Sequence, residues 1–147
     1  MAIEREATAT WEGNLARGAG RLSASSSVGF NGLAFSLPTR IGQPGDQTSP
    51  EELLAAAHAG CFAMALTSVL TNADVPPGTV EVRCRITLDE VGDEGLRITR
   101  STLIVDADVD GVSRDALRAA ANAADTSCPY SALLRDAGAT VLIEIGR

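Results

Sequence analysis

The sequence predicts an α+β fold in which mostly antiparallel strands surround one long central helix. One long segment is apolar almost throughout and carries clear helix start and stop signals. Most of the remaining chain consists of short β-compatible runs that are bounded by glycine, proline or asparagine. The 147 residues suffice for a single hydrophobic core, so we expect one domain over residues 1–147.

The N-terminal third predicts three short strands followed by a loop. Residues 8–11, 21–27 and 30–37 are β-compatible, and glycine and asparagine separate them. Residues 38–47 contain two glycines and two prolines, which predicts a loop.

The long helix is predicted over residues 50–72. Ser49 is a suitable N-cap, Pro50 suits the first helical position, and Glu52 completes a capping box. The Val75-Pro76-Pro77-Gly78 run ends the helix. Its apolar stretch approaches a membrane-spanning length. However, alanine and glycine dominate and a histidine interrupts it, so we expect a buried helix and no membrane partner.

The C-terminal half predicts a hairpin, two helices and a closing strand. Residues 79–91 alternate between apolar and polar side chains, which is typical of a half-buried strand, and residues 96–108 pair with them after a Gly-rich turn. Ser113 caps a helix that extends to about residue 124. Cys128-Pro129 opens a short helix to residue 135, and residues 139–145 form the last strand.

Composition excludes several functions. The net charge of −7 argues against a nucleic-acid partner or an anionic membrane surface. All twelve basic residues are arginine, which excludes Schiff-base and P-loop lysine mechanisms. The N-terminus lacks the features of a signal peptide, so we expect a cytoplasmic protein. In that reducing compartment, a disulfide between two of the three cysteines would be transient rather than structural.

The three cysteines have different predicted roles. Cys84 lies on the apolar face of a strand and is expected to be a buried structural residue. Cys61 lies about 16 Å from the start of its helix, too far for the helix dipole to activate it, so activation requires another group such as an arginine. Cys128 is an N-cap candidate whose thiolate would face free backbone N–H groups, which predicts that it is the more acidic thiol.

His58 lies one helical turn before Cys61, and three roles are open for it. It could orient or deprotonate the Cys61 thiol. It could be a core histidine bonded to a backbone carbonyl. It could also join Cys61 and Cys128 in a zinc site with an open position.

The helix sequence Pro50-Glu51-Glu52-Leu53-Leu54-Ala55-Ala56-Ala57-His58-Ala59-Gly60-Cys61-Phe62 resembles the osmotically inducible protein C (OsmC) family, which includes the organic hydroperoxide resistance (Ohr) proteins. The resemblance extends to Trp11-Glu12-Gly13-Asn14 and to Cys128-Pro129, so it spans nearly the whole chain. The Trp-Glu-Gly opening and His58 resemble the OsmC branch more than the Ohr branch.

The resemblance implies a cysteine-dependent peroxidase that reduces organic hydroperoxides without metal or other cofactor. Cys61 matches the peroxidatic cysteine and Cys128 the resolving cysteine. Glu51 matches the glutamate of the family motif, which pairs with an activating arginine. Arg40 fits that arginine best, with Arg17 second. An external dithiol or lipoyl-type reductant would reopen the disulfide.

The resemblance also implies an intertwined homodimer, and helix geometry favours one if Glu51 has the role that the resemblance implies. Glu51 and Cys61 are ten residues apart in one helix, about 15 Å along its axis, so a glutamate that serves Cys61 comes from a later helix start or from a second subunit. Small residues that would let two helices approach closely favour the second subunit. They are Ala55, Ala56, Ala59, Gly60 and Ala63.

Two further expectations concern the pocket and the alternative function. Phe62, Met64, Phe35 and Leu54 are candidate lining residues of an apolar substrate pocket. The alternative function is a stress-induced dimeric binding protein with a Cys/His metal site or with purely structural thiols.

Overall fold

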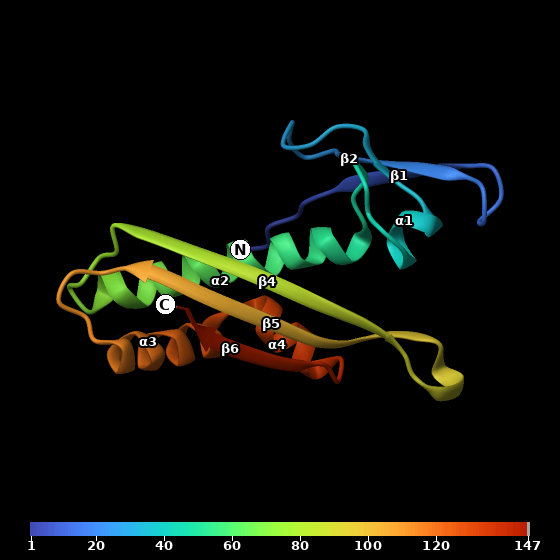
Figure 1. Cartoon of the computed structure of the whole chain (residues 1–147). Helices are drawn as coiled ribbons and strands as arrows, with labels where there is room; N and C mark the ends of the chain where they lie inside the picture. Colours follow the sequence, from blue (N-terminus) through green and yellow to red (C-terminus); the bar gives the residue numbers. More distant parts are fainter. Residues whose placement is uncertain (147) are drawn as a thin grey trace. The chain divides into compact units, whose positions relative to one another are not determined.

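The computed structural model describes residues 1–146, and the chain forms two compact units, Met1–Leu53 and Leu54–Arg147. The architecture is α+β, as predicted, with one small sheet in each unit and a long helix, α2 (Pro50–Asn72). The elements are labelled in Figure 1.

The first unit contains a three-stranded antiparallel sheet in the order β1-β2-β3. Its strands are β1 (Ala7–Glu12), β2 (Ala19–Ala24) and β3 (Leu33–Phe35). The rings of Trp11 and Phe35 pack with centroids 5.6 Å apart. A Cβ at Gly20 would lie 2.3 Å from the Phe35 ring, so this position of β2 requires glycine.

A short helix, α1 (Leu37–Ile41), replaces part of the predicted loop. Ser36 is its N-cap and forms a capping box with Thr39, in which each side chain accepts the other residue's backbone N–H. The prediction of a loop over 38–47 was wrong here because Thr39 takes the place of the usual Glu or Gln of a capping box. The same cap ends β3 at Phe35, two residues before the predicted strand end.

Helix α2 has the predicted bounds, although its capping box is only half formed. The Glu52 backbone N–H donates to Ser49 Oγ over 3.1 Å. The Glu52 carboxylate accepts from Thr48 Oγ1 over 2.7 Å, rather than from the Ser49 backbone.

The second unit contains the sheet β4-β5-β6. Strands β4 (Thr79–Glu90) and β5 (Leu96–Asp108) form the predicted antiparallel hairpin, with a short 3-10 turn, η1 (Gly92–Glu94), between them. Strand β6 (Thr140–Ile145) pairs with β5 in parallel. Helices α3 (Arg114–Ser127) and α4 (Pro129–Asp136) form the crossover that a parallel pairing requires.

One face of α2 packs into the core of the second unit. His58, Phe62, Leu66 and Leu70 repeat every four residues and are buried. The apolar members of this stripe join a core with residues of β5, α3 and the α4 N-cap. These residues are Leu103, Val105, Ala121, Ala124 and Cys128.

The rest of α2 is poorly covered in a single chain. An 18-residue window has mean hydropathy 1.8, so length and composition alone would allow a membrane span, but only 22% of the window is buried. A core helix of a soluble domain passes the same test, and the buried stripe of α2 packs against the sheet and α3.

Candidate active site

Cys61 and Cys128 lie together although 67 positions separate them in the sequence. Cys61 projects from α2, and Cys128 is the N-cap of α4. The Cys128 thiol donates to the Cys61 sulfur over 3.5 Å. Both thiols are free, and Cys128 is buried whereas Cys61 is partly exposed. Since a disulfide bond is about 2 Å long, a small movement would join the two sulfurs.

The surroundings of Cys61 act on its pKa in opposite directions. Burial raises the pKa of the Cys61 thiol, and the hydrogen bond from Cys128 adds to the rise. The backbone N–H of Tyr130, in the first turn of α4, lowers it. Within the second unit, no arginine is among the groups that shift this pKa.

The short helix begins at Pro129 as predicted, but its N-terminus does not serve Cys128. Cys128 makes no side-chain capping hydrogen bond. Its thiol is directed at Cys61 instead, and the free N–H of Tyr130 also acts on Cys61. The expectation that a Cys128 thiolate faces the free N–H groups of α4 was therefore wrong, because the cap position fixes the backbone but not the direction of the thiol.

Cys84 is half-buried on the inner face of β4, as the alternating pattern predicted. Its sulfur lies 3.3 Å from Ser101 Oγ and 3.9 Å from His58 Nδ1. Burial raises the pKa of the Cys84 thiol, and the hydrogen bond with Ser101 opposes this rise.

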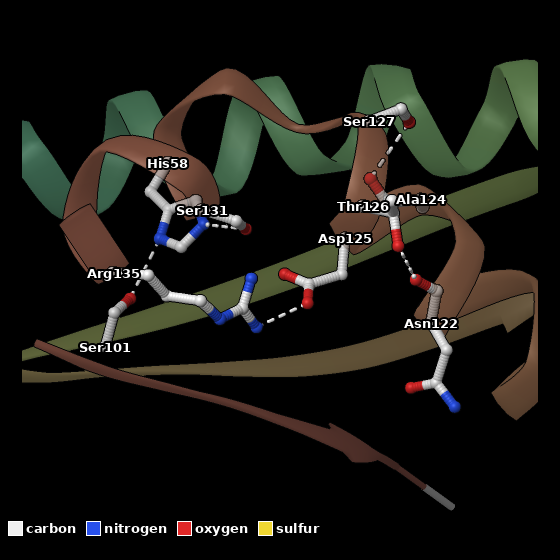
Figure 2. Close-up of polar contacts among 9 residues, drawn as sticks. All are labelled: His58, Ser101, Asn122, Ala124, Asp125, Thr126, Ser127, Ser131 and Arg135. Carbon is white, nitrogen blue, oxygen red and sulfur yellow. Dashed lines mark hydrogen bonds and ion pairs between the residues drawn. The ribbon is translucent and has the colours of Figure 1, made fainter.

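His58 is a core histidine, but its partners are hydroxyl groups and not a backbone carbonyl. Nδ1 is 2.8 Å from Ser101 Oγ, and Nε2 is 2.9 Å from Ser131 Oγ (Figure 2). Burial lowers the pKa of His58, and the Arg135 cation adds to this while Asp125 opposes it. The imidazole is therefore neutral at pH 7.

Arg40 and Glu51 form the predicted ion pair within the first unit. Arg40 Nη2 donates to the Glu51 carboxylate over 2.6 Å and Arg40 Nε donates over 3.1 Å, so the ion pair is bidentate. The hydrogen bond to Glu51 raises the pKa of Arg40. The Glu51 side chain is only 13% exposed, so its carboxylate interacts mainly with Arg40.

The other arginines of the N-terminal third have different surroundings. Arg21 donates to the Gly32 carbonyl over 3.0 Å. Arg17 is exposed, and the contact it makes is from its backbone N–H to Asn14 Oδ1. Of the two arginines considered for activation, only Arg40 is paired with Glu51.

The four proposed lining residues have separate surroundings. Phe62 is fully buried in the core, which corrects its assignment to a pocket. Met64 is 71% exposed and lines an open surface cavity of about 530 Å³ with other residues of the second unit. Phe35 packs on Trp11, and Leu54 is half-buried.

Sequence reasoning missed Ser101 and Ser131, the two serines that hold His58. Both are fully buried. The sequence contains one indication of Ser131: it follows Cys128 by three residues and therefore lies on the same helix face. Within residues 1–146, no group of three or more metal-ligating side chains converges, so the geometry gives the zinc alternative no support.

The fold and the site together define a class of protein: a small α+β protein with a long central helix whose thiol contacts a second thiol at the start of a short helix. The family model described as OsmC-like protein matches residues 43–144. Peroxiredoxin OsmC of Escherichia coli (strain K12) is 36% identical over 136 residues, which cover 92% of each chain. This chain belongs to the OsmC family.

Solved structures agree with this assignment. The organic hydroperoxide resistance protein OhrB of Bacillus subtilis is 27% identical, with a TM-score of 0.75 over 96% of this chain and 98% of its own. An OsmC-like protein of unknown function from Vibrio cholerae has a TM-score of 0.77 at 17% identity, over 99% of this chain and all of its own, which shows a shared fold.

Proposed function

We propose that this protein is a cysteine-based peroxidase that reduces organic hydroperoxides to alcohols, with Cys61 as the attacking thiol and Cys128 as the resolving thiol. The observation that carries the proposal is the contact of these two free sulfurs at 3.5 Å. The names of the relatives, a peroxiredoxin and an organic hydroperoxide resistance protein, support a peroxidase-type function and this substrate class.

In the first step, the Cys61 thiolate attacks the distal oxygen of the hydroperoxide. The O–O bond breaks, the alcohol leaves after taking up a proton, and Cys61 becomes a sulfenic acid. Cys61 is the better candidate for attack because it is partly exposed, whereas Cys128 is only 1% exposed. The Tyr130 N–H favours the thiolate of Cys61.

In the second step, the Cys128 sulfur attacks the sulfenic sulfur. A Cys61–Cys128 disulfide forms and one water leaves. An external dithiol, such as a lipoyl-type reductant, then exchanges with the disulfide and leaves as its own oxidised form.

The active form in this proposal is a homodimer with composite sites. Burial and the hydrogen bond from Cys128 raise the Cys61 pKa, so the proposed attack requires a nearby cation that favours the thiolate. Arg40 is a suitable cation, since Glu51 fixes its guanidinium. Glu51 and Cys61 are ten residues apart in one helix, or about 15 Å along the axis, which favours delivery of the Arg40–Glu51 pair by the partner subunit.

Both compact units then belong to one functional domain. The family match begins in the first unit and ends in the second, and helix α2 runs from one into the other.

The test is hydroperoxide consumption with cumene hydroperoxide and a dithiol reductant. We expect Cys61→Ser to abolish turnover. Cys128→Ser should allow one oxidation to a sulfenic acid that a dimedone-type reagent traps. Cys84→Ser is the matched control and should retain wild-type turnover, since this thiol contacts Ser101 and His58 rather than the sulfur pair.

Mass spectrometry after one equivalent of hydroperoxide identifies the bond formed. A Cys61–Cys128 disulfide with Cys84 free is the expected product. Unchanged consumption by Cys61→Ser would contradict the proposal, and a stable sulfenic acid on Cys128 would reverse the two roles.

A further inference from the structure

The buried imidazole of His58 connects three elements of the second unit. His58 lies on α2, Ser101 on β5 and Ser131 on α4, and none of the three is exposed (Figure 2). One ring nitrogen contacts each serine hydroxyl, at 2.8 Å and 2.9 Å. The Tyr130 ring stacks near the imidazole with centroids 6.5 Å apart.

The His58–Ser131 contact joins the same two segments as the contact between the two sulfurs, three residues away on each. Cys61 follows His58 by three residues on α2, and Ser131 follows Cys128 by three residues at the start of α4. Residues three apart in a helix lie on one face, one turn from each other. Two contacts therefore join the same two segments: His58 with Ser131 at 2.9 Å, and Cys61 with Cys128 at 3.5 Å.

A neutral imidazole suits this connection because it has one donor and one acceptor nitrogen. Each serine hydroxyl can donate or accept, so both ring nitrogens are satisfied in either tautomer. A buried polar group that loses its partner is costly, which makes this contact hard to break.

The first turn of α4 has few other polar attachments among the described residues. Arg135, in the last turn, forms an ion pair with Asp125 of α3 (Figure 2). That pair holds the far end of α4. The first turn is attached by Ser131 to His58, by the Cys128 thiol and the Tyr130 N–H to Cys61, and by packing.

We propose that His58 is a positioning residue which, through Ser131, holds the first turn of α4 so that Cys128 stays within reach of Cys61. The inference rests on the proposed peroxidase function and assigns His58 to one step of it. Formation of the sulfenic acid needs the Cys61 thiol and the Tyr130 N–H that lowers its pKa, but no movement of the Cys128 sulfur. Formation of the disulfide needs the Cys128 sulfur to approach from 3.5 Å to about 2 Å, so this step depends most strongly on the contact.

The test compares Ser131→Ala with Ser101→Ala. Each variant removes one hydroxyl from a fully buried site and one hydrogen bond from the same imidazole, but only Ser131 lies on α4. Rapid quench after one equivalent of cumene hydroperoxide, followed by mass spectrometry, measures sulfenic acid and disulfide separately. We expect Ser131→Ala to slow disulfide formation about five- to tenfold, since a lost buried hydrogen bond has effects of this size.

Ser101→Ala should leave both steps within about twofold of wild type, and Ser131→Ala should slow sulfenic acid formation less than disulfide formation. Ser131→Thr restores the hydroxyl and should return the rate toward wild type. Equal slowing by both alanine variants, or no slowing by Ser131→Ala, would overturn the inference. So would an alanine-like rate in a Ser131→Thr protein that melts at the wild-type temperature.

A second measurement does not depend on peroxide. Oxidised glutathione forms a mixed disulfide with Cys61, and attack by Cys128 then releases glutathione. The same order of rates is expected for this release. If wild-type protein does not react with hydroperoxide, the proposed function fails, while this measurement still decides whether His58 and Ser131 position Cys128.

Discussion

At the scale of single residues, the most informative feature is that the start of α4 acts differently on the thiols of Cys61 and Cys128. The N-terminus of α4 was expected to act on Cys128, and it acts on Cys61 instead. Burial raises the Cys61 pKa and the Tyr130 N–H opposes this rise only in part, so the proposed attack requires a further group that favours the thiolate. This imbalance is the physical reason for assigning Arg40 a role in activation.

His58 gives a prediction about pH and stability. Burial lowers its pKa in the folded chain, whereas in the unfolded chain the pKa is about 6.5. Below this value the unfolded state binds more protons than the folded state, so the free energy of unfolding falls as pH falls, by at most about 1.4 kcal/mol per pH unit. The stability is fully present above pH ~6.5 and decreases toward the folded pKa.

Thermal unfolding of the wild type between pH 7.5 and 5.5 measures this dependence. His58 is the one histidine in the chain, so His58→Gln should remove most of the slope in this range. Carboxylates with ordinary pKa values titrate mainly below it. A wild-type melting temperature that does not change with pH, or an unchanged slope in His58→Gln, would contradict a neutral buried imidazole.

At the scale of elements, the predictions from sequence were most accurate where the local start and stop signals agree with the pattern of buried residues. The bounds of α2 and β5 were predicted correctly, since a proline start marks α2 and the Gly92–Gly95 turn after an alternating strand marks the start of β5. Helix α1 was missed because its cap uses Thr39 at the third position. The parallel pairing of β6 depends on how α3 and α4 return the chain to β5, which no local pattern encodes.

The cap of α1 gives a prediction at this scale, because α1 carries Arg40. Ser36→Ala should lower the free energy of unfolding by about 1 kcal/mol, as loss of an N-cap usually does. It should also reduce kcat/KM for cumene hydroperoxide severalfold, since a frayed α1 presents Arg40 less well to Glu51.

Ser113→Ala is the matched control. Ser113 caps α3 by accepting the Ala116 N–H, and α3 carries none of the proposed catalytic residues. We expect a similar loss of stability, measured by urea unfolding, with unchanged kcat/KM. Equal kcat/KM in the two variants would show that the integrity of α1 does not matter for activity.

At the scale of the whole molecule, a single chain does not explain why one side of the apolar helix α2 is exposed. Opposite the buried stripe, Ala56, Gly60 and Met64 repeat every four residues and are exposed. A Cβ at Gly60 would have no heavy atom outside the helix within 4 Å. A second protomer packed on this small-residue stripe would explain why an 18-residue window of α2 with mean hydropathy 1.8 is so little buried.

Only part of the candidate site could be predicted from the sequence. The Cys61–Cys128 pairing came from family resemblance, because residues 67 positions apart share no local pattern. The Arg40–Glu51 pair was anticipated in the same way, and its geometry agrees. The serines around His58 could not be found, since only the folded arrangement of α2, β5 and α4 brings them together.

Mixed dimers test the composite site. Cys61→Ser lacks the proposed attacking thiol, and Arg40→Ala lacks the proposed activating cation, so each homodimer should be nearly inactive. If Arg40 serves the partner's thiol, a mixed dimer holds one complete site, with Cys61 from one protomer and Arg40 from the other. After unfolding and refolding together, the mixture should recover about a quarter of wild-type hydroperoxide turnover, since half the dimers are mixed and each has one of two sites.

A Gly60→Leu background supplies the control, because it should prevent α2 of one protomer from approaching its partner. A lone chain has room for this side chain, and leucine favours a helix over glycine by roughly 0.5–1 kcal/mol, so the fold should persist. Ala119→Leu, at an exposed position of α3, should leave sedimentation and recovery unchanged. If mass spectrometry shows mixed dimers but the mixture recovers no turnover, Arg40 serves the site of its own protomer. If Gly60→Leu sediments as a monomer and is fully active, the mechanism does not need the dimer.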